Sequence, residues 1–144
     1  MKHCQQGFTF IETCIVFSIF LLIVTITPLY YSKLVKHFET EHFLQQLKSD
    51  LYFAQLYSLT KEREVYARFY PDVEKYFFRD PLVGYIVERK YPDYVEFLYD
   101  GIIEFKFNIS GSTYPSGSLY LKIHGQKYRI IFHLGRGRFE VRKQ

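Results

Sequence analysis

This chain contains histidines, serines and glycines, the residue types that could bind a metal, act as a nucleophile or bind phosphate. Their spacings do not match the motifs that these functions require. His37 and His42 are five residues apart on a predicted helix, so they do not share a face as an i, i+4 zinc pair would. His124 and His133 could lie near each other across a hairpin, where we interpret them as a surface pair rather than a metal site. Gly135-Arg136-Gly137 is typical of a tight turn, and no Gly-x-Ser-x-Gly elbow is present. We therefore expect no enzyme activity, no cofactor and no metal.

The two cysteines, Cys4 and Cys14, both lie in the N-terminal segment. The remainder of the chain has none, so we expect no internal disulfide in its soluble part. We interpret Cys14 as a small apolar residue of a helix. A cross-link from Cys4 or Cys14 to a neighbouring chain stays open.

Glu12 is the ionisable residue that most needs an explanation, because it lies in an otherwise apolar segment from Phe8 to Leu29. As a helix, these 22 residues would be about 33 Å long, which is enough to span a bilayer core of about 30 Å. An acid at the centre of a span costs roughly 2.5–3.5 kcal/mol, and less near the interface. No small-x-small cleavage site follows the segment, so the expected cleavage point lies before it, at Gly7–Phe8. Glu12 is then either a tolerated interfacial acid or a group that pairs with a positive partner.

The stretch Gly7-Phe8-Thr9-Phe10-Ile11-Glu12 resembles the class III signal of type IV pilins and pseudopilins. In that family a short hydrophilic leader ends in Gly and is followed by Phe-Thr-Leu-Ile-Glu, so this sequence departs from the motif only at Phe10. The resemblance implies that a prepilin peptidase cuts between Gly7 and Phe8 and N-methylates Phe8. It also implies that Glu12 pairs with the terminal amine of a neighbouring subunit during assembly.

The predicted fold is α+β and pilin-like, with a long N-terminal helix packed on a C-terminal antiparallel sheet. We expect a leader over 1–7, a transmembrane and polymerisation helix over 8–30, an amphipathic helix over 31–61 and a β domain over 62–144. Pro28 removes one helical hydrogen bond and should kink the helix. Spacings of three and four place one stripe toward the sheet, formed by Leu44, Leu47, Leu51, Ala54 and Ser58. The polar residues expected on the opposite face are Lys48, Asp50 and Gln55.

From Glu62 onward the hydrophobic period changes to two, which predicts antiparallel strands with one face on the helix and the other in water. Asp100-Gly101 and Gly125-Gln126 are expected to be hairpin turns, and Ser110 to Ser118 a loop. The expected strands cover residues 64–70, 75–79, 85–91, 93–99, 102–108, 119–124, 127–134 and 138–143.

The C-terminal part resembles H-type pseudopilins, in which a Gly/Ser loop precedes a strand, a hairpin, Gly-x-Gly-Arg and a final strand. Within that group, the chain resembles the ComGD competence minor pseudopilins of Gram-positive transformation systems. This second resemblance is carried by Phe132, Leu134, Gly135, Gly137, Arg138 and Phe139. The resemblance implies a structural subunit of a competence pilus needed for DNA binding and uptake. Its implied partners are other major and minor pseudopilins, prepilin peptidase, membrane lipid and an inner-membrane assembly machinery with an ATPase.

The implied location is the cell membrane, as a single-pass protein, before assembly and the cell surface afterwards, with the C-terminal domain outside. Two other functions stay open. The first is an H-type minor pseudopilin of type II protein secretion. The second is a single-span membrane sensor or enzyme, which would keep its N-terminus uncut.

Positive charge is concentrated near the C-terminus. Residues 115–144 carry seven Lys/Arg and one Glu, a net charge of +6, which leaves −2 on the rest of the chain. Such an end indicates an anionic neighbour, which could be nucleic acid, a membrane surface or an acidic partner subunit; a solvated strand face is the alternative. The basic residues alternate with aromatic ones, as in single-strand binders. The candidate contact residues are Lys122, Lys127, Arg129, Arg136, Arg138 and Arg142.

Overall fold

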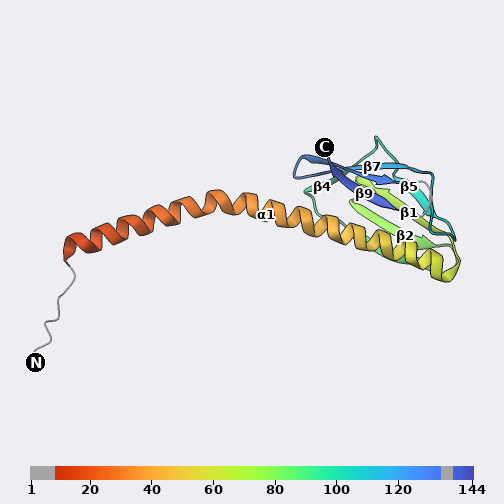
Figure 1. Ribbon diagram of the computed structural model, residues 1–144, viewed down its shortest axis with the longest axis horizontal. Helices are drawn as coiled ribbons and strands as arrows, with labels where there is room; N and C mark the ends of the chain where they lie inside the picture. Colours follow the sequence, from red (N-terminus) through yellow and green to blue (C-terminus); the bar gives the residue numbers. More distant parts are fainter. Residues whose placement is uncertain (1–8, 134–137) are drawn as a thin grey trace, which may run out of the picture. The chain divides into compact units, whose positions relative to one another are not determined.

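The computed structural model describes residues 9–133 and 138–144, without the side chains of residues 27–30. Contacts divide the chain into two compact units, residues 1–39 and 40–144. A single helix, α1 (Phe10–Lys61), supplies the described part of the first unit and continues into the second, where all the strands lie (Figure 1). The long helix and the antiparallel strands confirm the predicted α+β class.

The strands form two antiparallel sheets. Sheet A has five strands in the order β3-β2-β1-β5-β6, and sheet B has four in the order β4-β7-β8-β9. A short 3-10 turn, Pro71–Val73, links β1 to β2. The strands of sheet A are β1 (Val65–Tyr70), β2 (Lys75–Asp80), β3 (Gly84–Lys90), β5 (Glu104–Phe107) and β6 (Thr113–Tyr114). Those of sheet B are β4 (Val95–Leu98), β7 (Gly117–Ile123), β8 (Gln126–Phe132) and β9 (Phe139–Lys143).

The hairpin expected at Asp100-Gly101 is wrong. The strand before this turn, β4, pairs with β7, whereas the strand after it, β5, pairs with β1. The turn therefore crosses from one sheet to the other. A Cβ at Gly101 would lie 2.1 Å from the carbonyl oxygen of Ser118, and the N–H of Ile102 donates to that same oxygen at 3.0 Å. Glycine is required here because the crossing backbone lies against β7.

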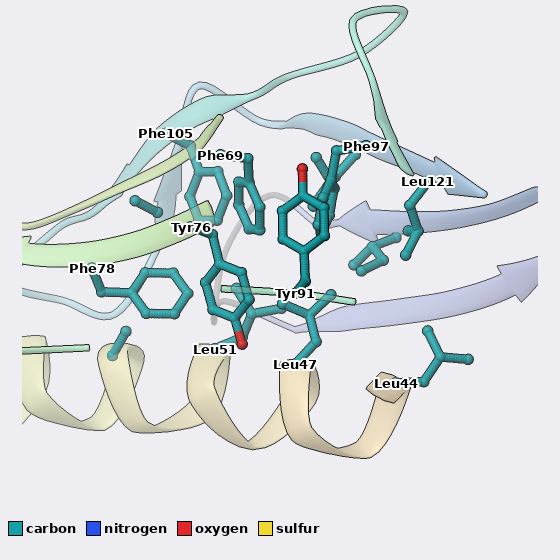
Figure 2. Packing of buried hydrophobic residues seen from close by; sticks show 14 of the residues in the cluster. Leu44, Leu47, Leu51, Phe69, Tyr76, Phe78, Tyr91, Phe97, Phe105 and Leu121 are labelled. Carbon is teal, nitrogen blue, oxygen red and sulfur yellow. The ribbon is translucent and has the colours of Figure 1, made fainter. Parts of the chain in front are cut away.

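The helix stripe predicted from the sequence is confirmed, because all five of its residues are buried in the second unit. Figure 2 shows Leu47 and Leu51 directed from α1 toward the aromatic side chains above the helix. Phe69 of β1 lies at the centre of these rings, with ring centroids 5.5 Å from Tyr76 and 4.7 Å from Phe97. Since Phe97 belongs to sheet B, one aromatic cluster joins the two sheets above the helix.

Candidate assembly segment and interaction surfaces

The N-terminal part of α1 is a continuous run of largely apolar side chains. The side chains from Phe10 to Ile26 are exposed; Ile11, for example, is 65% exposed and Leu22 63%. By length and composition, α1 is the one helix of the described chain that could cross a membrane. Aliphatic side chains left open in this number need lipid or another protein around them.

The hydroxyl groups within this apolar segment bond to the helix itself. The Ser18 hydroxyl donates to the carbonyl of Cys14 at 2.8 Å, and the Thr25 hydroxyl donates to the carbonyl of Leu22 at 2.9 Å. Such bonds let Ser and Thr enter an apolar medium without an unsatisfied polar group. Among the described residues, the Glu12 carboxylate has no ion-pair partner. Glu12 therefore remains the polar group that lipid would not satisfy.

Glu12 lies in the first turn of α1, three residues after Thr9. The backbone N–H of Glu12 donates to the Thr9 hydroxyl at 3.4 Å and to the Thr9 carbonyl at 3.1 Å. Thr-x-x-Glu is the spacing of a capping box, and an acid at a helix N-terminus is favoured by the helix dipole. A local capping role is thus a physical alternative to pairing with another subunit.

Three of the residues expected to take part in processing or bending lie, wholly or by their side chains, outside the described part of the chain. The cleavage and methylation sites, Gly7 and Phe8, lie outside the described residues. The bend expected at Pro28 also stays a prediction, because its side chain lies outside the described part of α1.

Four of the six predicted basic residues lie on one face of sheet B, which we call the basic face. The strand register pairs Lys122 with Lys127 across β7 and β8, and Arg129 with Arg142 across β8 and β9. Paired residues of an antiparallel ladder point to the same side of the sheet. Arg138 precedes β9 and is exposed, while Arg136 lies outside the described residues.

Acidic neighbours reduce the positive charge of the basic face. Lys122 lies 3.3 Å from a Glu96 carboxylate oxygen, and Arg142 donates twice to Glu140, both at 3.0 Å. The bond from Arg142 holds the pKa of Glu140 below its usual range. The Arg129 guanidinium lies over the Tyr120 ring at 5.6 Å and donates to the Ser118 hydroxyl. Two of the four cations of the basic face, Lys122 and Arg142, therefore have an acidic partner within the fold.

The expected proximity of His124 and His133 is wrong, because they lie at opposite ends of the β7–β8 hairpin. Ile123 pairs with Gln126 beside the turn, whereas Gly117 pairs with Phe132 at the far end. The His124 ring stacks on Tyr94 with centroids 4.5 Å apart, and His133 Nε2 lies 3.9 Å from a Glu140 oxygen. Across residues 9–133 and 138–144, no three His, Cys, Asp or Glu side chains come together as a metal site.

Asp50 is a polar residue whose role the sequence analysis missed. It was expected on the exposed face of the helix, but it is only 6% exposed. Its Oδ2 accepts hydrogen bonds from Arg89 Nε and from the Tyr76 hydroxyl, both at 2.6 Å, and Arg89 also donates to Oδ1 at 3.1 Å. Burial and the bond to Asp50 raise the pKa of Tyr76. One carboxylate thereby ties α1 to β2 and β3.

Replacing Asp50 with alanine should lower the free energy of unfolding by about 2 kcal/mol. Breaking a fully buried pair costs about 3–5 kcal/mol, and the Arg89 side chain, which is 45% exposed, can recover part of its hydration. Urea denaturation of the full chain in detergent, followed by near-ultraviolet circular dichroism, measures the loss. The matched control is Glu88→Ala, which removes a half-exposed partner of Lys75 and should cost less than about 1 kcal/mol. Equal losses in the two variants would contradict the role given to Asp50.

Among solved structures, the chain is similar to one described as the minor pseudopilin EpsH from the type 2 secretion system of Vibrio cholerae. The likeness has a TM-score of 0.57 at 11% sequence identity and covers 73% of this chain and 97% of that one. No protein-family model matches the sequence, and no curated protein matches it either. At this identity the likeness establishes the fold: the chain has the fold of a minor pseudopilin, with an N-terminal helix and antiparallel sheets.

Proposed function

We propose that this chain is a minor pseudopilin, a structural and non-catalytic subunit of a membrane-anchored filament. The observation that carries the proposal is the fold shared with EpsH along 73% of the chain. The exposed apolar half of α1, with Glu12 in its first turn, supports it independently. In this role the helix anchors the chain in the membrane until neighbouring pseudopilin helices replace the lipid around it.

We further propose that the filament is a competence pilus of the ComGD type, needed for DNA binding and uptake during transformation. The resemblance of the C-terminal Gly/Ser loop, hairpin and Gly-x-Gly-Arg motif to competence minor pseudopilins supports this assignment. The partners would be major and minor pseudopilins, prepilin peptidase and an ATPase-driven assembly machinery. After assembly the β domain would be exposed at the cell surface.

The second candidate is a minor pseudopilin of type II protein secretion. The specific observation in its favour is that the similar structure, EpsH, is described as part of such a system. Deleting the gene in its own host separates the candidates. Loss of transformation with normal protein secretion would support the competence role, and the reverse would support secretion.

The mature protein should lack Met1 to Gly7 and should begin at an N-methylated Phe8. This prediction rests on the resemblance of residues 7–12 to the prepilin signal. Intact-mass and N-terminal peptide mass spectrometry of the native protein measure it. The control is the same protein from a host without prepilin peptidase, which should retain Met1. A native chain that still began with Met1 would count against the filament role and favour the membrane sensor or enzyme.

A further inference from the structure

The outer face of sheet A carries a row in which tyrosines alternate with cations across all five strands. In the strand register, Arg79 lies between Tyr85 and Tyr66, and Lys106 lies between Tyr66 and Tyr114. We call these five residues the tyrosine–cation row. Its tyrosines are open to solvent, with Tyr85 60%, Tyr66 38% and Tyr114 64% exposed. This differs from the basic face of sheet B, where the ring of Tyr120 is partly buried beside Arg129.

Further aromatic and charged residues lie on the same face of sheet A, next to the tyrosine–cation row. Together with residues of the row they line a cavity. The Phe77 ring lies 5.0 Å from Tyr85 and 5.5 Å from Tyr70, measured between ring centroids. The cavity has a volume of about 360 Å³, within the 300–1,000 Å³ usual for small-ligand sites. Its lining consists of Tyr66, Arg68, Phe77, Arg79, Pro81 and Glu104. Aromatic surfaces and guanidinium groups thus meet in one hollow of the sheet.

The cations around this cavity are available to an anion to different degrees. Within the described residues, Arg79 forms no ion pair. Arg68 lies 3.6 Å from Glu104, but both side chains are about half exposed, so that pair is weak. Lys106 is held more firmly, because it lies 2.7 Å from Glu64 and lowers the pKa of that carboxyl. Arg79, which lies between Tyr85 and Tyr66 in the row, is therefore the strongest candidate for contact with a phosphate.

The turn at one edge of the cavity is held in place by Asp80, a fully buried carboxylate. Its Oδ1 accepts the backbone N–H of Leu82 at 2.8 Å, and its Oδ2 accepts the Tyr57 hydroxyl at 3.0 Å. These bonds fix the chain around Pro81 before any ligand arrives. A preorganised site loses less conformational entropy on binding than a mobile one.

We propose that the outer face of sheet A binds single-stranded nucleic acid. Exposed aromatic rings on an antiparallel sheet accept unstacked bases, and cations between the rings meet the phosphates. A neutral glycan would use the rings but would leave Arg79 without a matching charge. A duplex keeps its bases stacked on one another and would not use the rings. The inference does not depend on the proposed filament role, since the row lies entirely within the second unit.

The test measures the affinity of the full chain in non-ionic detergent for a fluorescein-labelled oligo(dT) of 20 nucleotides, by fluorescence anisotropy over a range of salt concentrations. We expect salt-sensitive binding. Tyr85→Ala should weaken it by about 5- to 150-fold, the effect of losing one stacked base. Arg79→Gln should weaken it several-fold and reduce the slope of log affinity against log salt by about 0.7, the value for one phosphate of a single strand.

Matched changes on sheet B provide the control. Tyr120→Ala and Lys127→Gln should each change affinity by less than about twofold if the site is on sheet A. Three outcomes would each overturn the proposal. The sheet B variants could lose as much affinity as the sheet A variants, or the chain could prefer a 20-base-pair duplex. The chain could also bind a neutral oligosaccharide and fail to bind oligo(dT). The filament role is tested separately, by mass spectrometry of processing at Gly7–Phe8. Failure of the filament role can therefore be distinguished from failure of nucleic-acid binding.

Discussion

Replacing Glu12 with alanine should leave the chain in the membrane and remove it from filaments. Insertion should become easier, because an apolar helix no longer carries a carboxylate that costs up to roughly 2.5–3.5 kcal/mol in lipid. If Glu12 pairs with the terminal amine of a neighbouring subunit, as the prepilin resemblance implies, assembly should fail, because that amine would lose its partner in a low-dielectric helix bundle. Removing one member of a buried pair costs about 3–5 kcal/mol, which corresponds to a loss of incorporation of roughly 100-fold or more.

A glutamine variant separates this role from the capping role that the structure also allows. The Glu12 backbone N–H bonds to Thr9, and Glu or Gln at this spacing can complete a capping box. Glu12→Gln should therefore keep the local helix start while it removes the charge. If pairing between subunits is the function, the glutamine variant should fail to assemble as the alanine variant does.

Membrane fractionation and the amount of chain recovered in sheared filaments measure these two effects. Glu41→Gln is the control, since it removes an exposed acid from the second unit of the chain and should assemble normally. Normal incorporation of Glu12→Gln together with failure of Glu12→Ala would assign Glu12 to capping. Normal incorporation of both variants would show that assembly needs neither pairing nor capping by Glu12.

The helix face was predictable from the sequence, whereas the partners of its polar residues were not. Leu47, Leu51 and Ala54 follow a 3.6-residue period that is local to the chain, and all three are fully buried. Asp50 lies at the margin of that stripe. Its burial depends on Arg89 and Tyr76, which the pairing of β2 with β3 places opposite each other.

Sheet topology explains the other differences from the sequence-based predictions. Asp-Gly indicates a turn, but turn chemistry does not determine which strands pair on either side of it. The sequence therefore favours a hairpin at Gly101, where the structure has a crossover between the sheets. Lys122 and Lys127 lie on a common face because they are paired across one hairpin, which is local to the chain. The tyrosine–cation row instead joins residues between 66 and 114, and only the order β3-β2-β1-β5-β6 brings them together.

Replacing Phe69 with alanine should produce the largest loss of stability in the β domain. Phe69 is 1% exposed, and its ring contacts those of Tyr76, Phe97 and Phe105 at centroid distances of 5.5, 4.7 and 6.2 Å. Phe→Ala substitutions in cores cost about 3–5 kcal/mol, through lost burial and the cavity left behind. Since domains are stable by about 5–15 kcal/mol, this is a large fraction of the total.

Urea denaturation of the full chain in detergent, with near-ultraviolet circular dichroism as the probe, measures this loss. Phe53→Ala is the matched control, because the Phe53 side chain on α1 is 49% exposed and its removal should cost less than about 1 kcal/mol. Phe69 belongs to sheet A and Phe97 to sheet B, so the ring of Phe69 contributes to the cohesion of both sheets. If Phe69→Ala cost no more than Phe53→Ala, the two sheets could not share a core at this point, and the packing of β1 against β4 would be wrong.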